Sequence, residues 1–427
     1  MNKIKEIFVT GFALFSMFFG AGNLILPPFL GFKSGSDWYL VTFGFAITAV
    51  MIPVLGILAH ARLQGTMFDF GKKISPIFST IYCLIVYTIS IALPAPRTAS
   101  VTHEMAIAPF FGTSSLLTSA VYFTLVFLFV INRSKVLSLI GKFLTPLIIV
   151  ILLSVIVISF FVSPDSVGVS LFKTPLINGV IEGYQTFDAI GAIVVGGVVI
   201  ISLNIQGGKS FEEKKELIKK GGWIAGIGLF VIYAGLILSG SLFSDVFPQT
   251  STRSQVLSGL SSETLGSLGA AFLSVLVALA CFTTAVGIVT GTADYFKGLF
   301  KNSQYAYKIT AVLGCVIGVL VGSFNVGFII DIALPVLMFI YPITIVLILL
   351  NVIPEQYASK LIFRTVVMIT FLFSVPDFLK FIIPAERLKD VINSIPLAKF
   401  SLGWVLPALM VFIIMNLIER KSNPSTS

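Results

Sequence analysis

Charged residues are scarce in this sequence. They make up 11% of its 427 residues, against 56% hydrophobic residues, and the mean hydropathy is +1.02. Because a soluble globular protein carries about 25% charged residues, the composition excludes that class and predicts a polytopic helical membrane protein. The net charge of +9 is therefore an indicator of membrane orientation and not of nucleic-acid binding. Only two histidines are present, both expected outside the span interiors, which leaves no cluster for an intramembrane enzyme.

Cysteine is also rare, and a nucleotide-binding motif is missing. Cys83, Cys281 and Cys315 lie inside apolar runs and are expected as small buried hydrophobes, not as a disulfide framework. Residues 207–210, Gly-Gly-Lys-Ser, resemble the tail of a P-loop, but Leu203 stands where the first glycine of that motif is required. We therefore expect no bound nucleotide and no direct drive by ATP.

Long charge-free runs are what the sequence has in abundance. They predict twelve membrane-spanning helices in a single transmembrane domain, residues 1–427. The first run is too long for the apolar core of a cleaved signal peptide, so we expect it to remain in the mature protein. The predicted spans are 7–32, 38–61, 74–96, 105–132, 143–164, 184–205, 221–244, 264–293, 309–330, 332–354, 365–383 and 400–418.

The distribution of lysine and arginine predicts the orientation. With both termini in the cytoplasm, 20 of the 28 basic residues fall in inner segments and eight, including Arg97, in outer ones. His60 is expected at an inner interface, and His103 and Glu104 in an outer loop. The charged stretch 209–220 could form a short amphipathic helix at the inner surface, but the preferred interpretation is a solvated loop.

The first apolar run is poorly suited to a continuous helix. Its middle reads Gly20-Ala21-Gly22-Asn23, and Pro27-Pro28 follows a turn later. Glycine costs a helix interior about 1 kcal/mol relative to alanine, and proline about 3 kcal/mol. A break at membrane depth is tolerated where protein or a watery cavity satisfies the backbone, and transporters use such breaks to hold substrate and coupling ion. The alternative is a helix that is merely kinked, with glycines for close packing.

Asp188 is the second candidate, because a carboxylate inside a membrane span is expensive and usually functional. Its neighbours Thr186, Gly191, Gly196 and Gly197 are small or polar, so the sixth span is predicted to break where the first does. The alternative places Asp188 near the outer interface, where it pairs only with water.

Two adjacent threonines in the eighth span are the third candidate. Thr283 and Thr284 follow Ala280 and Cys281, and their hydroxyl oxygens can add ligands to a cation. Membrane threonines commonly just hydrogen-bond to the carbonyl of the preceding turn, and taken alone the pair favours that structural reading.

Three segments together resemble the bacterial branched-chain amino acid:cation symporter family, within the amino acid–polyamine–cation superfamily. They are FFGAGNLILPP at 18–28, GYQTFDAIGA at 183–192 and ACFTTAVG at 280–287, and the resemblance extends over essentially the whole chain. It implies the leucine-transporter fold. Five helices at about 7–164 would be repeated in inverted orientation at about 184–354, with helices one and six broken, and two extra helices at 365–418.

The resemblance also implies the site. The α-carboxylate and α-amino groups of the substrate would meet the first break, with the second break facing it. The Na⁺ site shared across the fold would take helix-one carbonyls from Ser16 and Phe19, with Ala280, Thr283 and Thr284 from helix eight. The usual pattern of the fold requires no aspartate at 188, so the role of Asp188 stays open. The candidate substrate-binding residues are Gly20, Ala21, Gly22, Asn23, Tyr184, Thr186, Phe187 and Asp188.

The function implied is Na⁺-coupled import of leucine, isoleucine and valine across the bacterial cytoplasmic membrane. Na⁺ would be the coupling ion, and no cofactor, nucleotide or nucleic acid is expected. A proton-coupled symporter of the same fold, with Asp188 as the proton carrier, is the nearest alternative. An uncoupled channel is a more distant one, because the ionisable residues within the spans are few and local.

Overall fold

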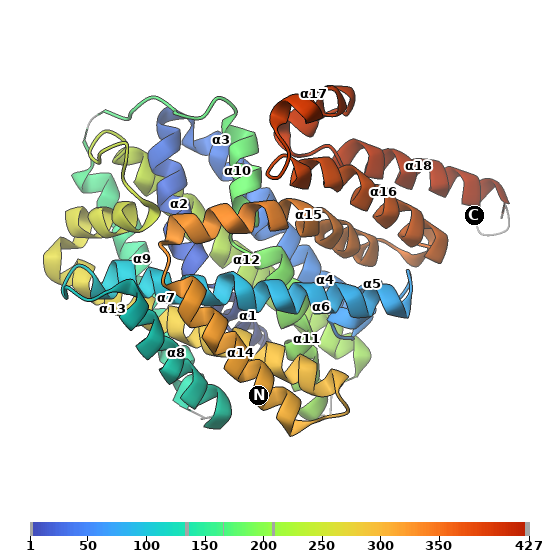
Figure 1. The fold of residues 1–427 in the computed structure, drawn as a ribbon, viewed down its shortest axis with the longest axis horizontal. Helices are drawn as coiled ribbons and strands as arrows, with labels where there is room; N and C mark the ends of the chain where they lie inside the picture. The colour runs from blue at the N-terminus through green and yellow to red at the C-terminus, as the bar shows by residue number, and fades with distance from the viewer. Residues whose placement is uncertain (1–2, 133–135, 165, 207–209, 423–427) are drawn as a thin grey trace.

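The computed structural model describes residues 3–132, 136–164, 166–206 and 210–422, and the regular elements in these ranges are all helices (Figure 1). The first predicted span is two helices, α1 (Lys3–Phe18) and α2 (Ala21–Ser34). The sixth is likewise two, α10 (Pro175–Tyr184) and α11 (Asp188–Gln206). The predicted breaks in both spans are therefore present.

Eleven further described helices make up the rest of the main body. The second span, α3 and α4, is continuous through a π-helix at Ile47–Met51, and the third, α6 and α7, ends in a π-helix at His103–Ile107. The bounds are α3 (Trp38–Ala46), α4 (Ile52–Leu63), α5 (Met67–Gly71), α6 (Pro76–Ala92), α7 (Pro94–Thr102), α8 (Ser115–Asn132), α9 (Val136–Val162), α12 (Phe211–Leu242), α13 (Arg253–Leu299), α14 (Gln304–Gly322) and α15 (Val326–Val352). Short 3₁₀ turns lie at Gly35–Asp37, Glu355–Tyr357 and Ala398–Phe400.

The C-terminal helices form an appendage on one side of the body. These are α16 (Lys360–Leu379), α17 (Ala385–Ser394) and α18 (Val405–Ser422), drawn in red in Figure 1. α16 packs against α15 and α18. The appendage therefore attaches to α15, the last helix of the main body. The two broken spans belong to the main body and not to the appendage.

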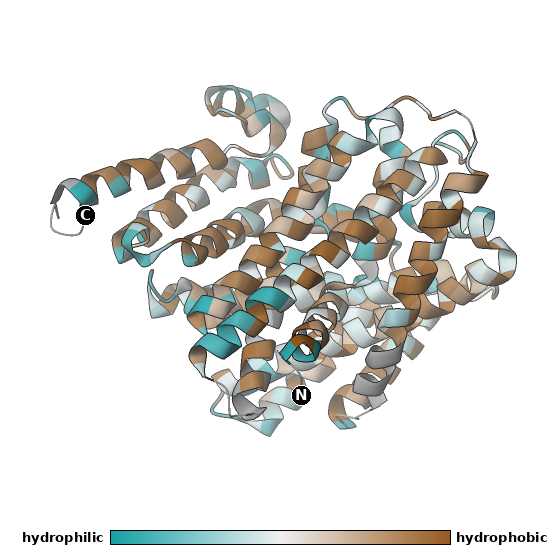
Figure 2. Cartoon of the chain, turned by 180° about the vertical axis from the view of Figure 1, so that it is seen from behind, coloured by the Kyte–Doolittle hydropathy of each residue, from teal (hydrophilic) through white to brown (hydrophobic). Residues whose placement is uncertain are grey.

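The described helices are apolar enough to cross a bilayer. Nine stretches meet the requirements of length and hydropathy within the described residues, and one of them, Gly22–Leu63, runs without interruption from α2 through α4. Figure 2 shows hydrophobic residues along the bodies of most helices. The multi-pass helical class is confirmed, whereas the number of twelve crossings stays a prediction.

Three predicted span boundaries are wrong. The sixth span was expected from 184, but its first helix, α10, begins at Pro175. The fourth span was expected from 105, but α8 begins at Ser115, and residues 103–107 complete the third span, so His103 and Glu104 lie in a helix end and not in a loop. The ninth and tenth spans were expected to meet near Asp331, yet α15 begins at Val326. The side-chain oxygen of Asn325 accepts from the N–H of Phe328 at 2.8 Å and caps α15. The charge at Asp331 was thus a poorer marker of the helix start than this N-cap.

Two further expectations are corrected. The charged stretch expected as a loop is the start of α12, because Ser210 and Glu213 form a capping box with bonds of 2.7 and 3.3 Å. Lys209 lies outside the described residues. His60, expected at an interface, is fully buried, with its ring nitrogens 2.7 Å from the carbonyl oxygen of Ile193 and 3.1 Å from that of Gly65. It packs α4 against α11 and does not face the membrane surface.

Glycines bring α2 and α12 into backbone contact. A side chain at Gly31 would overlap the carbonyl of Ile237, and one at Gly240 would overlap the carbonyl of Pro28. Small residues at a membrane helix interface permit this close approach. α2 also packs against α13, so the helix that follows the first break is held between these two long helices.

Candidate functional site

The first break is a turn closed by Asn23. Gly20 is extended, with φ −111° and ψ −175°, and its N–H donates to Asn23 Oδ1 at 3.3 Å, while the N–H of Asn23 donates to the Gly20 carbonyl at 3.1 Å. In a continuous helix the N–H of Gly20 would instead bond to the carbonyl of Ser16. The break therefore releases the Ser16 carbonyl at the end of α1 and leaves the first N–H groups of α2 without partners inside the helix.

The second break is held by Thr186. Its hydroxyl donates to the carbonyl of Gly183 at 2.9 Å and accepts from the N–H of Asp188 at 3.2 Å, so one side chain caps the end of α10 and the start of α11. Phe187 has φ +63°, in the left-handed region that a residue with a side chain rarely adopts. Strained backbone of this kind often marks a functional segment.

The two breaks meet through a buried hydrogen-bond network. Asn23 Nδ2 lies 2.9 and 2.7 Å from the two carboxylate oxygens of Asp188 and also donates to the Tyr233 hydroxyl, which in turn donates to Asp188 Oδ2 at 3.0 Å. All three side chains are buried. Because the carboxylate is bonded to protein groups, Asp188 is not an interfacial residue that pairs only with water. The charged group of α11 is instead joined to α2 and α12.

A buried arginine lies beside the same breaks. Arg97, expected in an outer loop, lies in α7 with 4% of its surface exposed. Its Nη1 donates to the carbonyl of Gln185 at 2.7 Å, and its guanidinium lies over the ring of Phe187, 5.3 Å from the centroid. A side chain at Gly22 would overlap this guanidinium. The loop prediction for Arg97 is therefore wrong, and the third span contributes a cation to the junction of the broken helices.

The threonine pair lies next to the first break. Thr284 packs against Gly20, since a Cβ built at Gly20 would lie 3.6 Å from its methyl group and 3.8 Å from its hydroxyl oxygen. Both Thr283 and Thr284 donate to the carbonyl of Ala280 at 2.9 Å, the back-bonding that is common for threonine in membrane helices. A donating hydroxyl keeps lone pairs that can coordinate a cation. The Ser16 side chain accepts from Thr145 of α9 at 3.1 Å, which leaves its backbone carbonyl as the relevant group.

The remaining candidate residues are divided between two environments. Phe19 is buried and stacks on Phe15, with ring centroids 5.1 Å apart. Tyr184 stacks on Tyr341 of α15 at 4.4 Å and belongs to a different apolar cluster from the residues of α2. Ala21 supplies the first residue of α2, and its side chain lies outside the described atoms.

A second polar cluster joins the start of α13 to neighbouring helices. Arg253 lies 3.3 Å from Glu182 of α10, with its guanidinium 4.7 Å from the ring centroid of Phe29 in α2. Glu104 accepts from the N–H of Val326 at 2.8 Å and from the hydroxyl of Ser254. The contacts of Arg253 join the start of α13 to α10 and α2, and those of Glu104 join it to the end of the third span and to α15.

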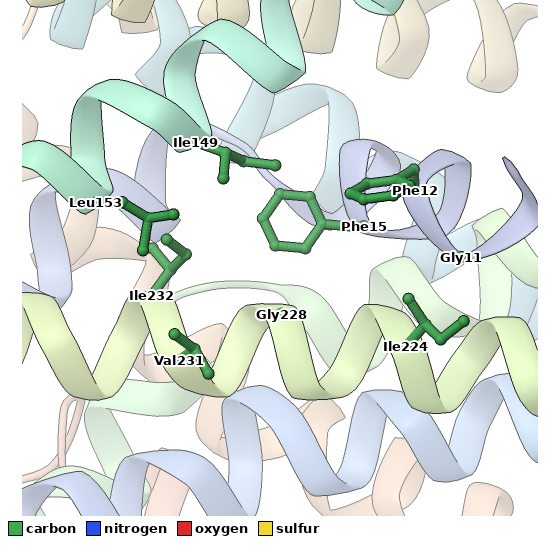
Figure 3. Close-up of a pocket in the computed structure, with 9 residues that line it drawn as sticks. All are labelled: Gly11, Phe12, Phe15, Ile149, Leu153, Ile224, Gly228, Val231 and Ile232. Atoms are coloured by element: carbon green, nitrogen blue, oxygen red, sulfur yellow. The ribbon is translucent and has the colours of Figure 1, made fainter. Parts of the chain in front are cut away.

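An apolar pocket of about 190 Å³ lies elsewhere, between α1, α9 and α12 (Figure 3). Phe12, Leu153 and Val231 at this pocket are exposed, as expected of side chains on a lipid-facing surface. It offers no polar side chain to a zwitterion, so it is not a candidate for amino acid binding. Its lining residues are Gly11, Phe12, Phe15, Ile149, Leu153, Ile224, Gly228, Val231 and Ile232.

Sequence reasoning missed Arg97, Gln185 and Tyr233. Arg97 comes directly after the predicted end of the third span at Pro96, so it was placed outside by one residue. The Pro94-x-Pro96 pair is the signal that could have placed Arg97 inside the third span, because Pro94 begins a new helix within that span. Tyr233 carries no local signal, because its partners lie 210 and 45 residues away.

Residues 3–422 match the family model described as branched-chain amino acid transport protein. The branched-chain amino acid permease BraB of Bacillus subtilis is 31% identical, covering 99% of this chain and 97% of that protein. The branched-chain amino acid transport system 2 carrier protein of Pseudomonas aeruginosa is 30% identical, covering 98% of both.

Solved transporters share the fold at low sequence identity. The inward-facing conformation of Mhp1 aligns with TM-score 0.60 and 13% identity over 97% of this chain and 91% of that one. MhsT in complex with L-phenylalanine aligns with TM-score 0.55 and 16% identity over 95% and 97%. Both have the leucine-transporter fold, so the predicted all-helical transporter fold is confirmed, while the number of twelve spans and the bounds of the inverted repeat stay predictions.

Proposed function

The chain belongs to the branched-chain amino acid transport protein family, and from this premise we propose that it imports leucine, isoleucine and valine together with Na⁺. The observation that carries the proposal is the meeting of two helix breaks at the buried network of Asn23, Asp188 and Tyr233. Broken helices at the centre of a transporter supply free N–H groups for a substrate carboxylate and free carbonyl groups for a cation.

Transport would proceed by alternating access around these breaks. The candidate substrate residues are the eight predicted ones, Gly20–Asn23 in the first broken span and Tyr184, Thr186, Phe187 and Asp188 in the sixth. An apolar pocket discriminates between side chains that differ by one methylene by only about 1–3 kcal/mol, so a single carrier for all three aliphatic substrates is physically expected.

The proposed Na⁺ site lies between the end of α1 and α13. Its ligands would be the carbonyl oxygens of Ser16, Phe19 and Ala280 and the hydroxyl oxygens of Thr283 and Thr284. Support comes from the release of the Ser16 carbonyl by the break and from the proximity of Gly20 to Thr284. An inward membrane potential adds about 2.3 kcal/mol per 100 mV for each charge moved, so sodium entry can drive accumulation of a zwitterionic substrate.

Proton coupling is the second candidate, and the burial of Asp188 favours it. A carboxylate enclosed by Asn23 and Tyr233 at the junction of two half-helices could exchange a proton if those contacts open and close during transport. In that case Asp188, and not the threonine pair, would hold the coupling ion.

We further propose that both termini face the cytoplasm of a bacterial cell. Placing Arg97 inside a span leaves seven basic residues in the predicted outer segments, against 20 in the inner ones. The correction therefore strengthens the asymmetry on which the orientation depends.

The test is uptake of labelled leucine by the purified protein in liposomes, with Na⁺ and pH gradients imposed separately. We expect accumulation with an inward Na⁺ gradient at uniform pH and none when choline replaces Na⁺. Accumulation under a proton gradient without Na⁺ would overturn the sodium assignment in favour of the proton one. No leucine uptake under either gradient would overturn the proposed function itself.

A further inference from the structure

Arg97 is a buried cation for which the fold provides only part of the hydrogen bonding. An arginine within an apolar span is unfavourable unless its charge is used, and such residues usually mark a ligand pathway. Its Nη1 atom donates to the backbone carbonyl of Gln185, and the Nε atom is buried without a hydrogen-bond partner among the described residues. The protein therefore holds this side chain in place and leaves part of its donor capacity unused.

The unused edge of the guanidinium faces the first break. Nε and Nη2 share one edge of the planar group, and Nη1, which bonds to Gln185, projects from the other side. Nη2 is the atom that a side chain at Gly22 would overlap. Gly22 lies in the first turn of α2, where N–H groups without intrahelical partners give the helix its positive end. Two positive features, a guanidinium edge and a helix N-terminus, therefore converge on one point.

A second unpaired group lies beside them. The side-chain oxygen Oε1 of Gln185 is buried without a hydrogen-bond partner among the described residues, in the segment whose carbonyl fixes Arg97. Three positions further along the chain, the Asp188 carboxylate supplies the opposite charge. Unused donors and an unused acceptor in one buried place are what a ligand with both an anionic and a cationic group requires.

We propose that Arg97 binds the α-carboxylate of the transported amino acid through the edge formed by Nε and Nη2. This inference deepens the proposed function and rests on it. A guanidinium edge matches the two oxygens of a carboxylate in a bidentate contact, which a lysine cannot reproduce. Phe187 covers one face of the guanidinium and Gln185 fixes Nη1, so the orientation of the free edge is set before the substrate arrives.

The alternative is that Arg97 only joins α7 to the second break, and ligand discrimination separates the two roles. In proteoliposomes, labelled leucine uptake is competed by unlabelled leucine and by isoamylamine, which has the same aliphatic chain and amine but no carboxylate. We expect the unaltered protein to prefer leucine by about 100-fold, the order of strength of a charge-assisted bidentate contact. In Arg97→Gln we expect leucine affinity to fall toward that of isoamylamine, while isoamylamine affinity stays unchanged.

Two further variants keep the test decisive. Arg97→Lys retains the charge without the bidentate edge, and we expect at least a tenfold loss of the preference for leucine. Arg387→Gln, an exposed arginine of α17, removes the same charge elsewhere and is the matched control. If Arg97→Gln loses affinity equally for leucine and isoamylamine, the inference is overturned. If Arg97→Gln does not fold, an unchanged preference for leucine in Arg97→Lys overturns it instead. Lack of leucine uptake by the unaltered protein would instead overturn the proposed function.

Discussion

The side-chain amide of Asn23 donates to both carboxylate oxygens of Asp188, at 2.9 and 2.7 Å. The two residues are 165 positions apart, and each lies in the first turn of the helix that follows a break. Any movement of α2 relative to α11 must stretch or break this contact. We therefore expect the hydrogen bonds between Asn23 and Asp188 to lengthen or break in every transport step in which the two broken spans change their relative position.

Removal of the charge at Asp188 should impair transport. In Asp188→Asn an amide replaces the carboxylate that accepts from Asn23 and Tyr233, and hydrogen bonds to a charged group are each worth roughly 1.5–3 kcal/mol. We expect the initial rate of leucine uptake to fall at least tenfold. Asp331→Asn is the matched control, because Asp331 is exposed on α15.

The pH profile of the same variant separates the two coupling ions. If Na⁺ drives transport, the residual uptake of Asp188→Asn should keep the pH dependence of the unaltered protein. If Asp188 carries the proton, that dependence should disappear. A normal rate with a normal pH profile would leave Asp188 a purely structural residue.

A single methyl group at Gly22 should disturb the binding site more than the fold. Gly22→Ala places a Cβ where the Arg97 guanidinium lies, with the carbonyl of Gln185 3.3 Å away. We expect leucine affinity to fall by about tenfold or more, because Arg97 must shift. Gly191→Ala is the control, since a Cβ at Gly191 has no neighbour within 4 Å. Equal leucine affinities in Gly22→Ala and Gly191→Ala would show that leucine binding does not depend on the position of Arg97.

Loss of one hydroxyl at Thr284 should weaken sodium dependence. Thr284→Ala removes a proposed ligand oxygen, and we expect the Na⁺ concentration for half-maximal leucine uptake to rise by about tenfold, which corresponds to roughly 1.4 kcal/mol. Thr284→Ser should restore it. Thr292→Ala removes another hydroxyl of α13 that bonds to its own helix, and should leave sodium dependence unchanged. An unaltered value in Thr284→Ala would exclude this residue from the site.

The sequence carried enough local information to predict the breaks. Gly20, Gly22 and the proline pair lower helix propensity in the first span, and Asp188 interrupts the sixth, so both discontinuities are visible as violations of a simple apolar helix. The first half of the sixth span, α10, was missed because Asn178 and Glu182 make this segment look like a loop.

Contacts between distant segments could not be predicted in this way. The placement of Arg97 depends on a carbonyl of the sixth span and on the absence of a side chain at Gly22, and neither is encoded near residue 97. Tyr233 likewise belongs to the network only because the glycines of α2 and α12 allow those helices to touch. Local pattern therefore located the breaks, whereas tertiary packing determined which side chains surround them.

That packing leads to a prediction about stability and not about transport. Gly31→Ala would place a methyl group against the Ile237 carbonyl of α12, where backbone and not a flexible side chain must move. Overpacking of this kind costs typically about 1–3 kcal/mol, so we expect a lower Tm for the purified protein in detergent. Gly287→Ala, at an exposed helical position of α13 with no neighbour within 4 Å, should leave the Tm unchanged or raise it slightly, because alanine favours helix over glycine. Equal Tm values for the two variants would show that α2 and α12 do not depend on this close backbone contact.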